Sequence, residues 1–156
     1  IQEHIDNLTR HIKLVREACE LLSERLIADK QPEMAVKIMA RGLVHDNSKF
    51  YGIEWDYLHN GQDVPDDALK LAIQQHQSTN DHHPEFWGGV DNMPEICIYE
   101  CVCDWLARAQ EFGTDVRDWI NDVAVKKYKI KKTSPQWKWI NECLDLLLVN
   151  HFKPSG

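Results

Sequence analysis

Apolar side chains recur in the first part of the chain at alternating spacings of three and four residues, which is the period of one face of an α-helix. This stripe predicts a helix over residues 2–28 and consists of Ile5, Leu8, Ile12, Val15, Cys19, Leu22 and Leu26. The stretch DKQPE interrupts the stripe, and Pro32 suits the first turn of a second helix over residues 32–45. The inward positions of that second helix are expected to be Ala35, Ile38, Met39 and Leu43.

Turn-forming residues divide the rest of the chain into shorter helical segments. Helices are predicted over residues 51–59 and 68–77, on either side of the turn-rich stretch NGQDVPDD. Residues 78–95 contain two prolines and two glycines and are predicted to be irregular. Three further helices are predicted over residues 94–112, 115–128 and 134–150.

No segment shows the alternating pattern of a β-strand, and the pattern therefore predicts an all-α fold. We expect residues 1–156 to form a single compact helical bundle of about six to seven helices. The content of 43% hydrophobic and 28% charged residues is that of an ordinary globular domain. The formal net charge of −7 argues against binding a nucleic-acid duplex, because proteins that do so are usually basic.

The compartment is indicated by apolar runs and by cysteine usage. No apolar run approaches the roughly 18 residues of a membrane span, and no signal peptide is visible, so we expect a cytoplasmic protein without a membrane partner. The cysteines are odd in number and contain no C-x-x-C pair, which favours reduced thiols over disulfides. They are expected to be small core residues, with a redox or metal role as the alternative, and they are Cys19, Cys97, Cys101, Cys103 and Cys143.

A histidine and an aspartate stand side by side in the stretch RGLVHDNSKF, residues 41–50, where the second helix is predicted to end. His45 is expected to face inward, since it lies seven residues after Ile38. Burying a carboxylate such as Asp46 is costly unless it is paired or binds a metal. The sequence must therefore supply partners for this doublet.

Further histidines and one aspartate supply candidate partners. His11 lies beside the apolar stripe of the first helix, and His76 lies in the helix predicted over residues 68–77. Asp104 falls on the apolar face of a later helix, where a carboxylate is unusual. A salt bridge from Asp104 to Arg108, four residues later, is the alternative. Of the remaining histidines, His59 and His151 are expected at the surface.

Imidazole nitrogens and carboxylate oxygens together suit divalent metals such as Mn, Fe, Co, Ni and Zn. In a His-Asp doublet the histidine can bind one ion while the carboxylate bridges to a second. Two ions a few ångströms apart lower the pKa of a shared water and hold a phosphoryl oxygen. The pattern therefore indicates hydrolysis at phosphorus, with one or two divalent ions as cofactor.

The order of these residues resembles the HD-domain superfamily of metal-dependent phosphohydrolases over roughly residues 8–110. The stretch HDNSK is similar to the H-D-x-x-K variant of its motif. The resemblance implies an HD-like bundle that binds Mn, Fe, Co, Ni, Mg or Zn. The implied metal ligands are His11, His45, Asp46, His76, either His82 or His83, and Asp104. The stretches HDNSKFYGIEW and NDHHPEFWGG also resemble a small, largely uncharacterised family of phage and bacterial HD-like proteins, which implies the cytoplasm of a bacterium or of a phage-infected host.

Two choices within this ligand set stay open. Because His82 and His83 are adjacent, only one is expected to face the site. His83 is favoured, since Pro84 restricts it to extended backbone, and His82 would then contact phosphate. His4 lies one heptad before His11 and is the alternative first ligand.

Other residues are expected around a substrate. The resemblance gives Lys49 a catalytic role beside Asp46, in contact with a phosphate or the metal-bound water; a solvated lysine is the alternative. Glu54 is expected to contact substrate or to orient a ligand histidine. Trp87, with Trp55 and Phe86, is expected to wall the pocket, although core packing is the commoner role of such aromatics.

Two surface features are also expected. The basic stretch KKYKIKK, residues 126–132, is a solvated helix end or a lip that attracts an anionic substrate. Exposed Trp137 and Trp139 could form the face of a homo-oligomer.

The favoured function is metal-dependent hydrolysis of a nucleotide or another small phosphate ester by metal-activated water. An HD-type dinuclear iron oxygenase acting on a small organic substrate is the alternative, because the same ligands can hold two irons. A non-enzymatic site that binds a nucleotide or metal is the third hypothesis.

Overall fold

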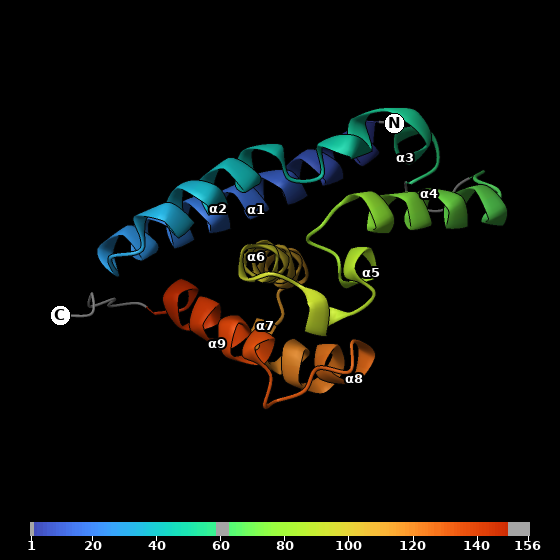
Figure 1. Cartoon of the computed structure of the whole chain (residues 1–156). Coiled ribbons are helices and arrows are strands. Elements are labelled where there is room, and N and C mark those ends of the chain that lie inside the picture. The colour runs from blue at the N-terminus through green and yellow to red at the C-terminus, as the bar shows by residue number, and fades with distance from the viewer. Residues whose placement is uncertain (1, 59–62, 150–156) are drawn as a thin grey trace.

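The computed structural model describes residues 2–58 and 63–149, and within these ranges it contains helices and no strand (Figure 1). The helices are α1 (Gln2–Ala28), α2 (Pro32–Val44), α3 (Gly52–Tyr57), α4 (Asp66–Thr79), α5 (Pro84–Trp87), α6 (Glu95–Phe112), α7 (Val116–Trp119), α8 (Val125–Lys127) and α9 (Pro135–Leu147). The 3₁₀ turns η1 (Asn47–Phe50) and η2 (Val90–Asn92) and the π turn η3 (Ile120–Ala124) complete the described secondary structure. The predicted all-α bundle is confirmed.

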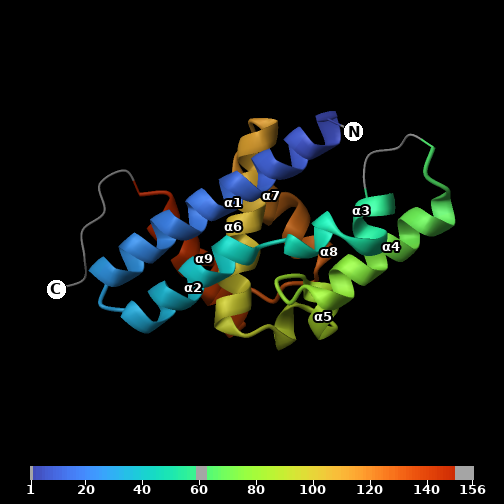
Figure 2. The same ribbon diagram turned by 90° about the horizontal axis from the view of Figure 1, so that it is seen from above.

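Helix α6 lies at the centre of the bundle. The antiparallel helices α1 and α2 pack on one side of it and α9 packs on the other (Figures 1 and 2). A helix between two layers must be apolar on most of its surface, and α6 buries side chains around most of its circumference. Its Ile98 and Val102 meet Leu22 of α1 and Ile140 of α9 in one hydrophobic core. This packing places Asp104, on the same helix, next to the end of α2.

Helices α1 and α2 approach each other closely at Gly42. A methyl group added there would lie 2.6 Å from Cβ of Cys19 on α1. Ala35 and Ile38 are buried as predicted, but the inward orientation predicted for Leu43 is wrong, because its side chain is 54% exposed. One residue turns a helix by about 100°, so Leu43 points away when Gly42 faces α1.

We expect Gly42→Ala to destabilise the protein. The two helices must separate to admit the methyl group, at a cost of about 1–3 kcal/mol in the free energy of unfolding. Urea unfolding followed by circular dichroism measures this change. Ala40→Gly, at an exposed position of the same helix, reports the intrinsic helix preference alone, which is about 1 kcal/mol in favour of alanine. A Gly42→Ala variant about 1 kcal/mol more stable than the parent protein, as helix preference alone would give, would contradict the close packing.

The segment predicted to be irregular, residues 78–95, contains the short helix α5 and the turn η2. Pro84 begins α5, where its missing N–H costs nothing. Gly88 ends α5 at a positive φ of 73°, a conformation that glycine adopts without strain. The prediction was therefore wrong for these two short elements, whose starts and stops are set by the same prolines and glycines.

The cysteines and the late tryptophans all pack inward. All five cysteines are free thiols and buried, which confirms their prediction as core residues. Trp137 and Trp139 are partly buried and pack against the core, so the prediction that they are exposed is wrong and the homo-oligomer stays a prediction.

No helix in the described part of the chain has the length and apolar character to cross a membrane. His59 and His151 lie outside the described residues.

Candidate metal centre

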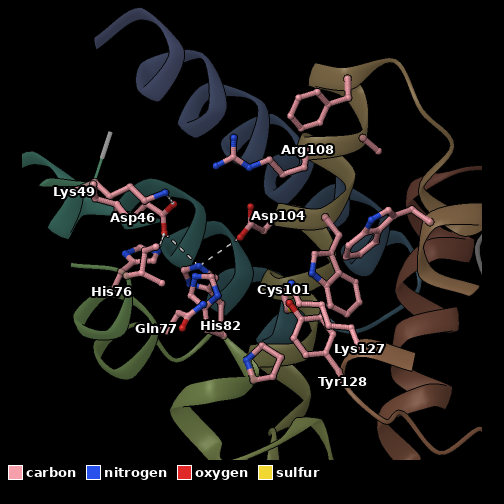
Figure 3. Close-up of a pocket in the computed structure, with 18 of the residues that line it drawn as sticks. Asp46, Lys49, His76, Gln77, His82, Cys101, Asp104, Arg108, Lys127 and Tyr128 are labelled. Carbon is pink, nitrogen blue, oxygen red and sulfur yellow. Dashed lines mark ion pairs between the residues drawn. The ribbon is translucent and has the colours of Figure 1, made fainter. Parts of the chain in front are cut away.

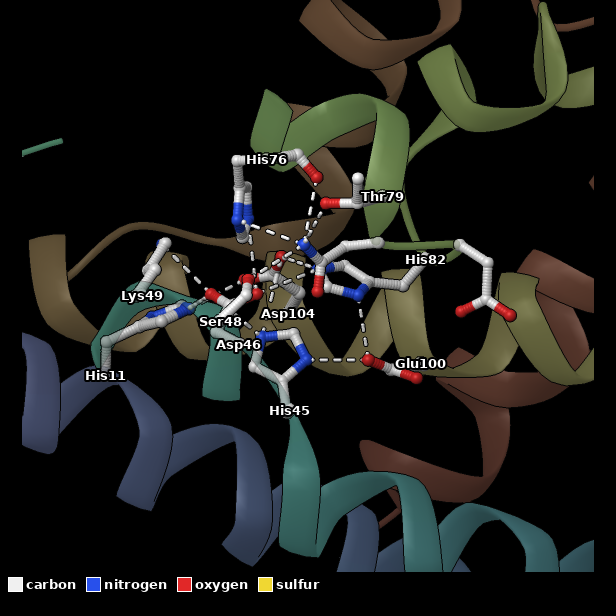
Figure 4. Close-up of polar contacts among 12 residues, drawn as sticks. His11, His45, Asp46, Ser48, Lys49, His76, Thr79, His82, Glu100 and Asp104 are labelled. Carbon is white, nitrogen blue, oxygen red and sulfur yellow. Dashed lines mark hydrogen bonds and ion pairs between the residues drawn. The ribbon is translucent and has the colours of Figure 1, made fainter. Parts of the chain in front are cut away.

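Histidine and aspartate side chains from four parts of the chain converge at one buried point (Figure 4). They come from α1, the end of α2, the segment from α4 to α5, and α6. The residues are His11, His45, Asp46, His76, His82, His83 and Asp104. Each sequence-predicted ligand is therefore part of this cluster. His4, the alternative to His11, instead packs against the ring of Trp55, with centroids 5.3 Å apart.

The end of α2 turns Asp46 into the centre of the cluster. His45 leaves the helix with extended backbone, and Asp46 adopts the left-handed conformation with φ of 55° and ψ of 22°. Few residues other than glycine adopt this conformation, although aspartate and asparagine do so most readily. Both side chains are buried. A strained residue held by its surroundings is a common feature of functional sites.

One group of ligand atoms surrounds Oδ2 of Asp46. This oxygen lies 3.4 Å from Nε2 of His45 and 3.9 Å from Nε2 of His11. Asp104 closes the group, with Oδ1 2.9 Å from Nε2 of His11 and Oδ2 3.9 Å from Nε2 of His45. Ligands about 2.1 Å from a common ion are about 3.0 Å apart at right angles and about 4.2 Å apart when opposite. His11, His45 and Asp104 therefore have the spacing of ligands to one ion, and Oδ2 of Asp46 lies beside the two histidines.

A second group surrounds the other oxygen of the same carboxylate. Oδ1 of Asp46 lies 3.3 Å from Nε2 of His76 and 3.2 Å from Nε2 of His82. His83 completes this group, whose four ligand atoms all lie within 4.8 Å of one another. The expectation that only one of His82 and His83 faces the site is therefore wrong. The extended backbone predicted for His83 is present. His82 before it lies in a turn, so the two side chains do not alternate as they would along a strand.

The opposite nitrogen of four of these histidines is held by a glutamate. The pairs are His11 Nδ1 with Glu111 at 3.1 Å, His45 Nδ1 and His82 Nδ1 with Glu100 at 2.7 and 2.8 Å, and His76 Nδ1 with Glu54 at 2.5 Å. An ionised carboxylate only accepts hydrogen bonds, so each Nδ1 donates, and in a neutral imidazole the Nε2 then turns a lone pair inward. Carboxylates commonly orient metal-binding histidines in this way.

The inward atoms make no hydrogen bonds with one another. Nε2 of His11, His45 and His82 and Oδ1 of Asp46 are all buried without a hydrogen-bond partner among the described residues. Several lone pairs that converge without a proton between them repel one another and are costly to bury. A divalent cation removes this cost, so the donor set fits one or two ions.

The charges of the cluster are strongly coupled. Burial favours the neutral imidazole, but Asp46 and Glu100 outweigh it and raise the pKa of His82 to about 9. Burial likewise opposes ionisation of Asp46, yet the neighbouring histidines, His45 first, hold its pKa well below the usual range. His83 differs, because burial and then His82 lower its pKa to about 3. An ion that binds here must therefore displace protons from histidines such as His82.

Basic side chains surround the cluster. Lys49 extends its ammonium to within 2.9 Å of Oδ2 of Asp46, and its side chain is only 13% exposed, so it is not a solvated lysine. Arg41 binds Oε1 of Glu100 at 2.6 Å and also pairs with Asp81. Arg108 pairs with Glu111 at 3.1 Å, whereas the ion pairs of Asp104 in the described chain are with histidines.

A cavity of about 830 Å³ opens beside the cluster and includes Asp46, Lys49, His76 and Asp104 in its walls (Figure 3). The aromatic side chains that line the cavity are not the predicted ones. They are Trp105, Phe112, Trp119 and Tyr128. The predicted wall of Trp55, Phe86 and Trp87 is wrong, because none of the three lines this cavity. Trp87 instead donates a hydrogen bond to the carbonyl of Asp81 at 2.8 Å.

Glu54 and His82 were both expected to contact the substrate, and the structure places them differently. Glu54 is buried behind His76 and does not line the cavity, which supports the orienting role over substrate contact. His82 is one of the clustered histidines and lines the cavity as well.

The sequence did not lead us to expect Glu100 and Glu111 at the site. They lie four residues before and seven residues after Asp104, which places all three on one face of α6. This spacing is the signal that could have identified them.

Comparison with known proteins identifies a family for which no function is described. A family model with the description "Family of unknown function (DUF5662)" matches residues 1–146. Comparison with curated proteins and with solved structures found no match.

Proposed function

We propose that this chain, which belongs to the DUF5662 family of unknown function, is a metal-dependent phosphohydrolase that cleaves a small phosphate ester such as a nucleotide. One observation carries the proposal: the two oxygens of Asp46 face different histidines, with Oδ2 3.4 Å from Nε2 of His45 and Oδ1 3.2 Å from Nε2 of His82. A carboxylate in this position can bridge two ions. The HD-domain resemblance of the sequence agrees with this arrangement.

In the proposed hydrolysis, a water oxygen forms a bond to phosphorus, the ester P–O bond breaks, and a proton passes to the departing alcohol. Bound divalent ions would supply positive charge that acidifies water and neutralises the phosphoryl oxygens. Lys49 adds a cation beside Asp46, within the cavity where a phosphoryl group would lie. The glutamates behind the histidines hold each Nε2 in place, so the site needs little rearrangement during the reaction.

Metal analysis tests this proposal first. We expect about two ions per chain after purification or reloading with Mn²⁺, and about one in His45→Ala and in Asp104→Ala, because each variant loses a ligand of one group only. Elemental analysis measures the ions, and phosphate release measures turnover. His4→Ala is the matched control, because His4 lies outside the groups that could hold an ion.

The identity of the metal and the reaction decides between the hypotheses. Phosphate release that depends on Mn²⁺, Co²⁺ or Ni²⁺ supports the hydrolase. Bound iron with uptake of dioxygen and no phosphate release would instead favour the oxygenase. A wild-type protein that binds no metal after reloading would overturn the proposal, and the histidine cluster would then be structural.

A further inference from the structure

The cavity beside the metal centre extends well beyond the space that a phosphoryl group needs. Its volume of about 830 Å³ lies in the range of pockets that enclose whole small molecules. Asp46, Lys49 and Asp104 lie at one end, and Lys127 and Tyr128 lie at the other (Figure 3). We call the part lined by Trp105, Trp119, Lys127 and Tyr128 the aromatic chamber.

Three aromatic side chains form one rigid wall of the aromatic chamber. Trp105 stacks on Tyr128 with centroids 5.9 Å apart and 19° between the planes, and it meets Trp119 edge-on at 5.5 Å. All three are partly buried and pack against the hydrophobic core. Aromatic surfaces held in this way offer flat faces on which another ring can stack at little entropic cost.

The π turn between α7 and α8 aims two of the chamber residues in a similar direction. Lys127 lies eight residues after Trp119, and in a regular α-helix it would point about 80° away from it. The wider turn at Ile120–Ala124 absorbs about one extra residue. The side chains of Trp119 and Lys127 then point within about 20° of each other around the helix axis. Both line the cavity. Such π turns are frequent at functional sites.

The polar groups of the aromatic chamber are few. Among the described residues, Gln77 and Thr114 are the uncharged amide and aliphatic hydroxyl side chains that line the cavity. Lys127 places its ammonium 5.2 Å from the centroid of the Tyr128 ring. The indole N–H groups of Trp105 and Trp119 and the ammonium of Lys127 donate hydrogen bonds but accept none. A polyol would therefore bury several hydroxyl groups with few acceptors for their protons, at a cost for each. A flat ring needs few partners and gains contact with the wall.

We propose that the aromatic chamber binds a flat aromatic ring carried by the organic part of the substrate, so that the substrates are aromatic phosphate monoesters of nucleoside size. This inference rests on the proposed phosphohydrolase function. Its consequence is selectivity against sugar phosphates and other polyol phosphates, which carry the same reacting group.

Adenosine 5′-monophosphate and ribose 5-phosphate provide a matched test, because they share the phosphorylated sugar and ribose 5-phosphate has a hydroxyl where the nucleotide has its base. We expect kcat/KM of the Mn²⁺-loaded protein to be at least about 10-fold higher for the nucleotide, since stacking of one base on aromatic side chains has this size of effect. Equal kcat/KM values for the two compounds would overturn the inference while leaving the hydrolase in place.

A variant pair locates the effect. Trp119→Leu is expected to raise KM for adenosine 5′-monophosphate about 10-fold and to leave KM for ribose 5-phosphate unchanged. Trp137→Leu is the control, because Trp137 is also partly buried but does not line the cavity. A similar loss for both substrates in Trp119→Leu would count against the aromatic chamber.

Binding without turnover separates this inference from the proposed function. Calorimetric titration with adenosine and with ribose uses ligands that have no phosphoryl group. Binding of adenosine but not ribose, weakened in Trp119→Leu, supports the aromatic chamber even if the protein hydrolyses no ester. Absence of adenosine binding from a protein that hydrolyses phosphate esters would overturn the inference alone.

Discussion

Asp46→Asn is expected to abolish phosphate release, with a loss on the order of 1,000-fold or more, and to reduce the bound metal to at most one ion per chain. An amide has one oxygen and no charge, so it cannot hold ions on both sides as the carboxylate of Asp46 can. Elemental analysis and phosphate release with Mn²⁺ measure the two effects.

Asparagine is the informative replacement at this position because of the backbone. Asp46 has a positive φ of 55°, which asparagine tolerates almost as well as aspartate and alanine does not. The variant should therefore keep the turn after α2, and circular dichroism should show unchanged helix content. Asp67→Asn, at an exposed aspartate of α4, is the control for loss of one negative charge. Metal content and turnover equal to those of the parent protein would rule out the bridging role.

Glu100→Gln is expected to lower the affinity of the protein for both ions by about 10–100-fold. Oε2 of Glu100 accepts a hydrogen bond from His45 of one group and from His82 of the other. Its other oxygen is bound by Arg41. A glutamine must turn its NH₂ group either toward the histidines or toward Arg41, and all of these are donors. Calorimetric titration of the metal-free protein with Mn²⁺ resolves the two affinities.

Two neighbouring glutamates give matched controls for this experiment. Among the clustered histidines, Glu111 contacts His11 alone, so Glu111→Gln should weaken the binding of one ion. Glu54 contacts His76 alone among them, so Glu54→Gln should weaken the binding of the other ion. Each is the same chemical change at a similar hydrogen bond. If Glu100→Gln weakened one ion only, Glu100 would not link the two groups, although each group could still bind its own metal.

The helices were largely predictable because their signal is local. The apolar stripe of α1 and the proline that begins α2 predicted those helices to within one residue at each bound that the structure describes. The error at Leu43 had a different origin. Nothing within α2 shows that Gly42 faces α1, because that depends on Cys19 of another helix.

The candidate site was predictable only as a set of residues. The order of His11, the His-Asp doublet and Asp104 indicated that they would meet, and the structure brings them together. The aromatic walls were assigned to the wrong tryptophans, since Trp105 and Trp119 reach the cavity through the packing of α6 against α7. Whether these residues bind metal stays a prediction.

By itself, the sequence determined the helical class, the bounds of α1 and α2 to within a residue, and the side chains available for metal chemistry, because periodicity, turn residues and residue type act over a few positions. Only the tertiary structure decided which oxygen of Asp46 faces which histidines, that His82 and His83 share one group, and that one glutamate contacts both groups. These features depend on how helices distant in sequence cross and on side-chain directions at the crossing. Their geometry is determined by the packing of the whole core.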